Sequence, residues 1–243
     1  MNLAQYKLNQ TQRLAKEPKY RVICDACDQP DFCCYCAQVT TFDPQISFVI
    51  LIHPIEVKRR IATGRMSHLS LKNSHLIAGQ DYSQNAKVNA LLEEKEYHSV
   101  VLYPGATSQN LSTLSPLEKA KIFPREKKLR IFVVDGTWAT ARKMMRLSEN
   151  LKNLPRVCFS PDKPSNFRVR KQPHPQCYST IEAIHHTIEL LGDSRGFPVK
   201  TRLHDRLLSV FEYMVERQLQ FIKVSKETSI TGNYRKKNLD REL

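Results

Sequence analysis

Glycine is scarce in this chain, and the nucleotide-binding motifs that depend on glycine are absent. Only 7 of the 243 residues are glycine, and the sequence contains neither G-x-G-x-x-G nor G-x-x-x-x-G-K-[ST]. Both motifs need glycine so that the backbone can approach a phosphate closely. The helical zinc motif H-E-x-x-H is missing as well. These absences argue against a nicotinamide-dependent enzyme, an ATPase and a metalloprotease of that type.

Long apolar runs and a secretory leader are also missing. The longest apolar run is Phe48–Ile52 with its flanks, far short of the roughly 18 residues that a membrane-spanning helix needs. Residues 1–19 are polar and lack the apolar stretch of a signal peptide. Since 41% of the residues are hydrophobic, the chain can still bury a core. We expect a folded, cytoplasmic protein with no membrane association.

Acidic residues are few relative to basic ones, and the imbalance is concentrated. The chain has 38 Lys and Arg against 24 Asp and Glu, which gives a formal net charge of +14. Residues 119–171 hold fifteen of the cations and only four of the acids. This favours a polyanionic partner, because each phosphate that a cation contacts releases counterions. The alternative is a basic enzyme that binds no nucleic acid.

Five of the seven cysteines lie in one short segment, residues 24–36. Cys24 and Cys27 form a C-x-x-C pair, which offers two thiolates to one tetrahedral ion. The second pair is either Cys34 with Cys36 or Cys33 with Cys36. A zinc site with four cysteine ligands is closed, so it would stabilise this segment rather than perform chemistry. The alternatives are buried or redox-active thiols and, less favoured by the tight spacing, an iron–sulfur cluster.

The hydrophobic pattern predicts an α/β fold with a mainly parallel sheet flanked by helices. Continuous apolar runs of the buried parallel type predict strands at 47–53, 75–79, 99–103, 130–135 and 156–159. Periodic stretches predict helices at 86–95, 115–122, 137–151, 179–191 and 203–221. We expect a leader and cysteine knuckle over 1–45, a catalytic domain over 46–222 and a polar, mobile tail over 223–243.

Three predicted strands end in compact polar loops. These loops are His53-Pro54, Tyr103-Pro104-Gly105 and Asp135-Gly136-Thr137-Trp138. Ligands of open α/β sheets bind beyond the carboxyl ends of the strands, so the loops should converge on one pocket. Asp135 is a candidate general base or orienting acceptor, and Trp138 is a candidate stacking surface or pocket wall. The alternative is that Asp135 only caps the following helix and that Trp138 is plain core.

Two further motifs suggest an anion site. Arg168 and Arg170 alternate, so in an extended segment both would point to one face, as suits a phosphate or carboxylate. Ser179 and Glu182 predict a capping box at a helix N-terminus, which would hold an anion beside the two arginines. Thr63-Gly64-Arg65, taken alone, indicates the C-terminal turn of a helix.

Several of these motifs together resemble the DTW-domain family. That family is named for its Asp-x-Thr-Trp motif, present here as Asp135–Trp138 and followed by 168–173 and 179–183. The match extends to His53-Pro54, Thr63–Arg65, Tyr103–Gly105 and the cysteines of 24–36, in the family's order. It implies a SPOUT-like fold with a C-terminal trefoil knot and a small N-terminal zinc knuckle. A knot is a topology that sequence physics alone would not predict.

The resemblance also implies an activity. It implies a tRNA-uridine aminocarboxypropyltransferase, which transfers the 3-amino-3-carboxypropyl group of S-adenosylmethionine to N3 of a tRNA uridine and releases 5′-methylthioadenosine. Two alternatives stay open: an S-adenosylmethionine-dependent RNA methyltransferase of SPOUT type, and a non-catalytic zinc-knuckle module that binds RNA. The implied partners are S-adenosylmethionine as co-substrate, structural Zn²⁺ and tRNA.

The motifs and the resemblance together give a set of expected site residues. The expected catalytic residues are Asp135, Thr137 and Trp138. The expected S-adenosylmethionine ligands are Tyr103, Pro104, Gly105, Gly136, Trp138, Ser179, Thr180 and Glu182. The expected RNA-binding residues are Arg65, Lys127, Lys128, Arg130, Arg168, Arg170 and Lys171. The zinc ligands implied by the resemblance are Cys24, Cys27, Cys34 and Cys36, with Cys33 outside the set.

Overall fold

The protein is built around a six-stranded sheet in which every pairing is parallel. The computed structural model describes residues 22–57, 59, 61–170 and 174–227, so the predicted leader and most of the predicted tail lie outside the described residues. The strand order is β2-β1-β5-β3-β6-β4. The strands are β1 Ser47–Ile52, β2 Ser74–Ala78, β3 Tyr97–Leu102, β4 Gln109–Asn110, β5 Lys128–Asp135 and β6 Arg156–Cys158.

Helices cover both faces of the sheet, which confirms the predicted α/β class. They are α2 Pro54–Val57, α3 Thr63–Ser70, α4 Ala86–Glu93, α5 Pro116–Ile122, α6 Trp138–Leu147, α7 Glu149–Lys152, α8 Thr180–Leu191 and α9 Asp205–Glu227. Short 3-10 turns are η1 Asp31–Cys33, η2 Cys36–Gln38, η3 Asp193–Arg195 and η4 Val199–Thr201. All five predicted strands are present, whereas β4, α2 and α3 were not predicted.

The predicted helix over 137–151 is wrong as a single element, because the chain breaks at Ser148 between α6 and α7. The buried Ser148 hydroxyl accepts a hydrogen bond from the backbone amide of Tyr82 at 3.0 Å. This contact with a distant segment decides the break, and the local periodicity does not reveal it.

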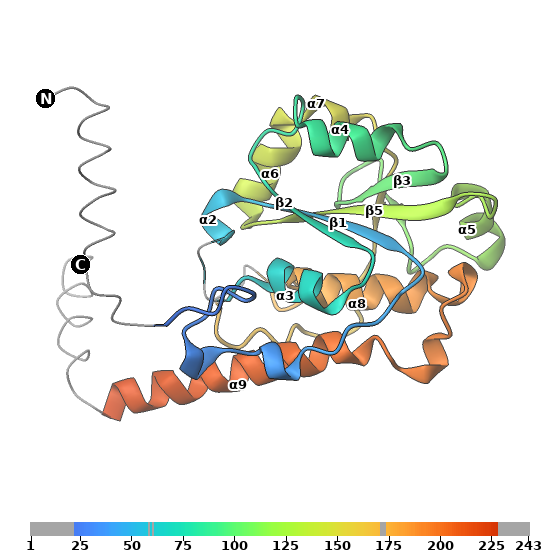
Figure 1. Ribbon diagram of the computed structural model, residues 1–243. Helices are drawn as coiled ribbons and strands as arrows, with labels where there is room; N and C mark the ends of the chain where they lie inside the picture. The colour runs from blue at the N-terminus through green and yellow to red at the C-terminus, as the bar shows by residue number, and fades with distance from the viewer. Residues whose placement is uncertain (1–21, 58, 60, 171–173, 228–243) are drawn as a thin grey trace, which may run out of the picture.

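The alternating side chains of the central strands enter two separate cores. Phe48 and Ile50 of β1 pack on the side of α3, α8 and α9, while Val49 and Leu51 pack on the opposite side with α4 and α6. Figure 1 shows these two helical layers on either side of the sheet. Burial on both faces explains why β1 has no polar alternation.

The register of the strands brings the polar loops to one edge. Ile52 of β1 is level with Asp135 of β5, and Leu102 of β3 is level with Val133. The loops that follow these strands therefore begin at the same carboxyl edge of the sheet. The backbone amide of His53 donates to the carbonyl of Asp135 at 2.9 Å, which fastens two of the loops together.

The cysteine segment packs against the main domain rather than standing apart. Cys27 and Tyr35 are buried in the same core as β1 and α8. Arg217 of α9 donates to the carbonyl of Phe32 at 2.7 Å, and the Phe32 ring meets the Phe221 ring at 5.2 Å. The helix α9 continues to Glu227, past the predicted boundary at 222.

None of the described helices is long and apolar enough to cross a membrane. The trefoil knot and the SPOUT-like topology stay predictions.

Candidate functional site

A pocket opens at the carboxyl edge of the sheet. Its volume is about 570 Å³, within the usual range for a small-molecule site. Its walls come from the ends of β3, β5 and β6, the start of α6 and the start of α8. The predicted site residues that line it are Tyr103, Pro104, Asp135, Gly136, Thr137, Trp138, Arg170, Ser179 and Thr180. Two of the three predicted strand-end loops thus line one cavity, whereas His53 and Pro54 of the third loop do not line it.

Asp135 lies at the bottom of this pocket, where two helices begin. Its side chain is only 5% exposed, and Thr180 at the start of α8 donates its hydroxyl to Oδ1 at 2.6 Å. Gly64, at the start of α3, lies so close that an added Cβ would be 2.2 Å from Oδ2. Thr63–Arg65 forms the first residues of α3, so the prediction that these residues form the C-terminal turn of a helix is wrong. Among the residues that the structure describes, Oδ2 has no hydrogen-bond partner.

The pKa of Asp135 is raised to about 6. Burial is the largest cause, and the neighbouring carboxylate of Glu56 raises it further. The Thr180 hydroxyl, the Arg170 guanidinium and the Gly64 backbone amide act in the opposite direction but do not outweigh burial. A carboxylate with a pKa near neutrality can accept and release a proton at the pH of the cell.

The capping interpretation of this motif does not fit the geometry. Thr137, not Asp135, caps α6, since its hydroxyl accepts from the backbone amide of Thr140 at 3.2 Å. Trp138 is 44% exposed and lines the pocket, so it is not a core side chain. The catalytic role of Asp135 stays a prediction, but a capping role is not what the structure shows.

The predicted capping box at α8 is present, and it changes the role expected for Glu182. The Glu182 carboxylate accepts from the amide and hydroxyl of Ser179, from the hydroxyl of Ser165 and from the amide of Asn166, at 2.6–3.0 Å. All of these partners are protein groups, and Glu182 does not line the pocket. The prediction that Glu182 binds the co-substrate is therefore wrong: it fastens the 165–166 loop to α8.

Arg168 and Arg170 do not share one face. The segment turns rather than extends, with the Arg170 amide donating to the Phe167 carbonyl at 3.1 Å, so the alternation argument fails. Arg168 is 48% exposed and forms a surface ion pair with Glu216 of α9, so its role in RNA binding stays a prediction. Arg170 instead lines the pocket, with its guanidinium 3.8 Å from Glu56 Oε1.

Two charged residues of the site were missed by the sequence analysis. Glu56, in α2, is 3% exposed, and its Oε1 lies 3.0 Å from the guanidinium of Arg59, which also lines the pocket. The buried Glu56 carboxylate thus lies within ion-pair distance of both guanidinium groups, although its Oε1 has no hydrogen-bond partner among the described residues. Glu56 follows the predicted strand-end loop His53-Pro54 closely, so the strand-end argument could have included it. No local signal marks Arg59.

Most of the predicted RNA-binding cations lie away from the pocket. Arg130 is 2% exposed and forms an ion pair with Glu94 at 2.8 Å. Its guanidinium also donates to the Leu91 carbonyl and lies over the Tyr97 ring, 3.6 Å from the ring centroid. The prediction that Arg130 contacts RNA is therefore wrong. Lys127 and Lys128 are exposed, but they lie at the amino end of β5, about 23 Å from Asp135 along a strand that rises roughly 3.3 Å per residue.

The remaining predicted residues have mixed outcomes. Arg65 pairs with Asp28 of the cysteine segment at 2.6 Å, so it links that segment to α3 instead of facing solvent freely. Gly105 is exposed and does not line the pocket, which corrects its assignment to the co-substrate site. Lys171 lies outside the described residues.

The four predicted zinc ligands come together. Cys24 and Cys36 have their sulfurs 3.7 Å apart, as do Cys27 and Cys34, and all four lie within 4.8 Å of one another. Sulfurs on a tetrahedral zinc ion with bonds of about 2.3 Å would be roughly 3.8 Å apart. Cys33 is buried outside this group, 3.9 Å from the Gln218 side-chain nitrogen.

The chemistry of this cluster also fits a cation. Burial and the neighbouring thiols raise the pKa of Cys36, and burial raises that of Cys27. Four thiolates at this separation repel one another unless a cation lies between them. The cluster therefore fits a structural zinc ion bound through Cys34 and not through Cys33.

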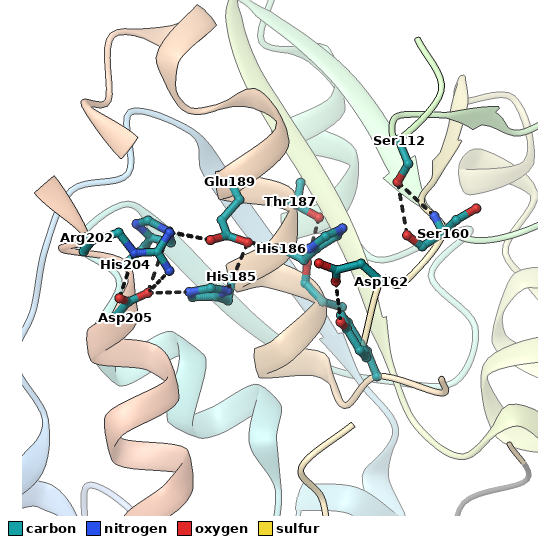
Figure 2. Close-up of polar contacts among 12 residues, drawn as sticks. Ser112, Ser160, Asp162, His185, His186, Thr187, Glu189, Arg202, His204 and Asp205 are labelled. Atoms are coloured by element: carbon teal, nitrogen blue, oxygen red, sulfur yellow. Dashed lines mark hydrogen bonds and ion pairs between the residues drawn. The ribbon is translucent and has the colours of Figure 1, made fainter. Parts of the chain in front are cut away.

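A second group of histidines and acids lies away from the pocket, between α8 and the start of α9 (Figure 2). His185 and Asp205 contact each other at 2.8 Å, and the Arg202 guanidinium bonds both Asp205 and Glu189 at 2.6–2.9 Å. Because one arginine bonds both carboxylates and His185 contacts Asp205, this group is an ion-pair network that holds the two helices together.

One sequence motif resembles the nucleophile elbow of hydrolases, but its position in the fold does not fit that role. Gly192–Gly196 fits G-x-S-x-G, a pattern that acts as a nucleophile elbow only between a strand and a helix. Here it follows α8, and the Ser194 hydroxyl donates to the Leu191 carbonyl at 2.7 Å. The motif runs from the C-cap of α8 through the 3-10 turn η3.

Comparison with known proteins identifies the family. Residues 21–219 match the model of the DTW domain, which covers most of the chain. The chain belongs to the DTW domain family. This DTW protein is 25% identical over 217 residues to mouse tRNA-uridine aminocarboxypropyltransferase 2, covering 84% of this chain and 67% of the mouse protein. It is 25% identical over 230 residues to Arabidopsis thaliana tRNA-uridine aminocarboxypropyltransferase A, covering 85% of this chain and 84% of that relative.

A further relative is Drosophila melanogaster tRNA-uridine aminocarboxypropyltransferase 2, which is 27% identical over 175 residues, covering 69% of this chain and 66% of the relative. No solved structure matches this DTW chain. Each of these relatives is named as a tRNA-uridine aminocarboxypropyltransferase. The motif that names the family, Asp135–Trp138, forms the bottom and one wall of the pocket.

Proposed function

We propose that this DTW protein is a tRNA-uridine aminocarboxypropyltransferase that uses S-adenosylmethionine and releases 5′-methylthioadenosine. The names of its relatives support the class of reaction. The observation that carries the proposal is the environment of Asp135, which lies at the bottom of a pocket of about 570 Å³. Its buried carboxylate has a pKa of about 6, and within the described part of the chain one of its oxygens has no hydrogen-bond partner.

Asp135 would act on the nucleophile. N3 of uridine carries a proton, and it becomes nucleophilic as that proton moves to the Asp135 carboxylate. N3 then forms a bond to the carbon next to sulfur in the aminocarboxypropyl chain, while the carbon–sulfur bond breaks and its electron pair stays on sulfur. The positively charged sulfonium of S-adenosylmethionine supplies the leaving group as a neutral thioether, so the protein needs no catalytic metal.

Thr180 and the two helix N-termini would set the position of the base. The Thr180 hydroxyl fixes Oδ1 at 2.6 Å, which leaves Oδ2 as the oxygen that can receive the proton. The starts of α3 and α8 direct partial positive charge toward the carboxylate and favour its ionised form. Burial opposes ionisation, and the balance gives a base that works near neutral pH.

Arg59 and Arg170 would select which carbon of the co-substrate reacts. Both line the pocket and lie within ion-pair distance of the buried Glu56. A pair of guanidinium groups suits the carboxylate of an amino-acid chain. Anchoring the amino-acid end in this way would present the aminocarboxypropyl carbon, rather than the methyl, to the acceptor.

Product analysis tests the proposal. The purified protein is incubated with bulk tRNA and S-adenosylmethionine, and the small-molecule products are separated. We expect 5′-methylthioadenosine and a mass increase of the uridine by one aminocarboxypropyl group. S-adenosylhomocysteine with methylated RNA would instead establish the methyltransferase alternative, and no product with any tRNA would favour a binding module.

A further inference from the structure

The outer face of α6 carries cations with no partner in the described part of the chain. Arg142, Lys143 and Arg146 are exposed, while Ala141, Met144 and Met145 bury the opposite face of the helix against the sheet. Within the residues that the structure describes, these three cations make no ion pair or hydrogen bond. Three unneutralised charges within about one turn of helix create a local positive field.

This face is continuous with the pocket. Trp138, Arg142 and Arg146 are spaced four residues apart, so they form one stripe with steps of about 6 Å along the helix. Trp138 is the half-exposed pocket wall at the start of α6. The stripe therefore begins at the pocket mouth and runs outward along α6, on the α4 side of the sheet (Figure 1).

Several other cations already have partners or lie far from the pocket. Arg130 and Arg168 are paired with Glu94 and Glu216. Arg195 donates to the carbonyls of 123, 124 and 127 at 2.6–3.3 Å. The exposed Lys121 and Lys127 lie near α5, at the end of the molecule opposite α6 in Figure 1. The α6 stripe is thus an unpaired positive surface that reaches the pocket.

We propose that the α6 stripe, Trp138, Arg142 and Arg146 with the adjacent Lys143, binds the backbone of an unpaired RNA segment that carries the target uridine into the pocket. This inference rests on the proposed function. N3–H lies on the pairing edge of uridine, so the acceptor must be unpaired before it can react. An aromatic ring beside a row of cations is the usual combination for binding single-stranded nucleic acid, because the ring stacks a base and the cations follow the phosphates.

A pair of charge-matched double variants tests the inference. Arg142→Gln/Arg146→Gln removes two charges from the stripe, and Lys72→Gln/Lys121→Gln removes two exposed charges that lie outside the stripe. For both variants and the wild type, tRNA affinity is measured at several salt concentrations, S-adenosylmethionine affinity is measured separately, and methylthioadenosine formation is followed as tRNA is varied.

We expect the stripe variant to bind tRNA at least roughly tenfold more weakly. The slope of log affinity against log salt concentration should become shallower by about two, one for each lost phosphate contact. Its KM for tRNA should rise, while kcat at saturating tRNA and the affinity for S-adenosylmethionine stay near wild type. The matched variant should change these values by less than about twofold. Melting curves check that both variants are folded.

Two results would overturn the inference. Equal effects of the two double variants would show that only net charge matters, and unchanged tRNA affinity in the stripe variant would show that RNA crosses another surface. Wild-type binding of polyglutamate as tight as binding of tRNA would identify a general polyanion surface and also contradict it. In each case the wild type still produces methylthioadenosine, whereas failure of the proposed function would remove that product from the wild type itself.

Discussion

At the scale of single residues, the protonation state of Asp135 affects the stability and the activity of the protein in opposite directions. Its pKa is about 6 in the fold against an ordinary value of 3.8, so the folded state holds the proton more tightly than the unfolded chain. Its contribution to stability is therefore greatest below about pH 4 and is lost as the pH rises through about 6. The ionised carboxylate that the reaction needs is the form that destabilises the protein.

Asp135→Asn should separate these two effects. The amide keeps the size and can still accept from Thr180, but it cannot take a proton, so we expect methylthioadenosine formation to fall by roughly 10²–10⁴-fold. Thermal melts at pH 8 should show stability equal to the wild type or higher, by at most about 3 kcal/mol, and the difference should shrink at pH 5.

Asp193→Asn is the control for this prediction. Asp193 is exposed beyond the end of α8, and an amide oxygen can still accept from the Val199 backbone amide, so both properties should stay unchanged. Near-normal turnover of Asp135→Asn would exclude a proton-accepting role for Asp135.

Gly64 gives a second prediction at this scale. A Cβ at Gly64 would lie 2.2 Å from Asp135 Oδ2 and 2.9 Å from its Cγ, so Gly64→Ala must displace the carboxylate or the start of α3. We expect a strong loss of turnover in a protein that still folds. Gly105→Ala is the matched control, because its Cβ would meet its nearest neighbours at 3.5 Å, an ordinary contact. Equal activity of the two variants would mean that the site tolerates a shift of Asp135.

At the scale of elements, the network between α8 and α9 makes the fold sensitive to acid. Burial lowers the pKa of His204, and hydrogen bonds from Arg202 outweigh burial to lower the pKa of Glu189 and of Asp205. All three groups bind protons less readily in the folded state than in the unfolded chain. The stability that they contribute is present near neutral pH and is lost as the pH falls below about 6.5 and then through the carboxylate range.

Arg202→Gln tests this network. The variant removes the cation shared by Glu189 and Asp205, so we expect denaturant unfolding at pH 7.5 to show a loss of about 1 kcal/mol, discounted because the arginine is half exposed. Its loss of stability between pH 7.5 and 5 should be smaller than that of the wild type. Lys152→Gln, which breaks an exposed pair with Glu149 one helical turn away, should change stability by less than about 0.5 kcal/mol. A parallel pH dependence in wild type and Arg202→Gln would place the acid sensitivity elsewhere.

At the scale of the whole molecule, the cysteine cluster stabilises a part of the core that spans distant segments. Cys27 and Tyr35 pack with residues of β1, α3 and α9, so loss of the metal would loosen contacts between the two ends of the described chain. We expect chelation to lower the melting temperature by several degrees and to reduce turnover without any direct contact with the pocket.

Cys34→Ser and Cys33→Ser form a matched pair for this prediction. Cys34→Ser should purify with less than stoichiometric zinc and melt at a lower temperature, because it removes one of four ligands. Cys33→Ser should keep one zinc ion per chain, since its sulfur lies outside the cluster. Full zinc content in Cys34→Ser would assign the fourth ligand to another residue.

Local patterns in the chain were enough to predict five of the six strands, the edge of the sheet that carries the pocket and the segment that carries the cysteine cluster. Apolar runs such as that of β1 have no polar alternation, because both faces are buried, and this pattern is local. The loop after β5 lies at the ligand-binding edge in any parallel sheet. The Cys24–Cys27 spacing and the capping box of Ser179 and Glu182 are also local chemistry, and the structure contains both.

The choice of charged side chains at the site, in contrast, depends on long-range packing. Arg130 and Arg170 are both arginines of the basic region, yet the first is buried beside Glu94 and the second faces the pocket beside Glu56 of α2. Gly64 gains its importance because α3 begins against Asp135. The partners in each case come from elements far away in the chain. The local sequence determines the type of each side chain and the face of the element on which it lies. The tertiary fold determines which residues it contacts there.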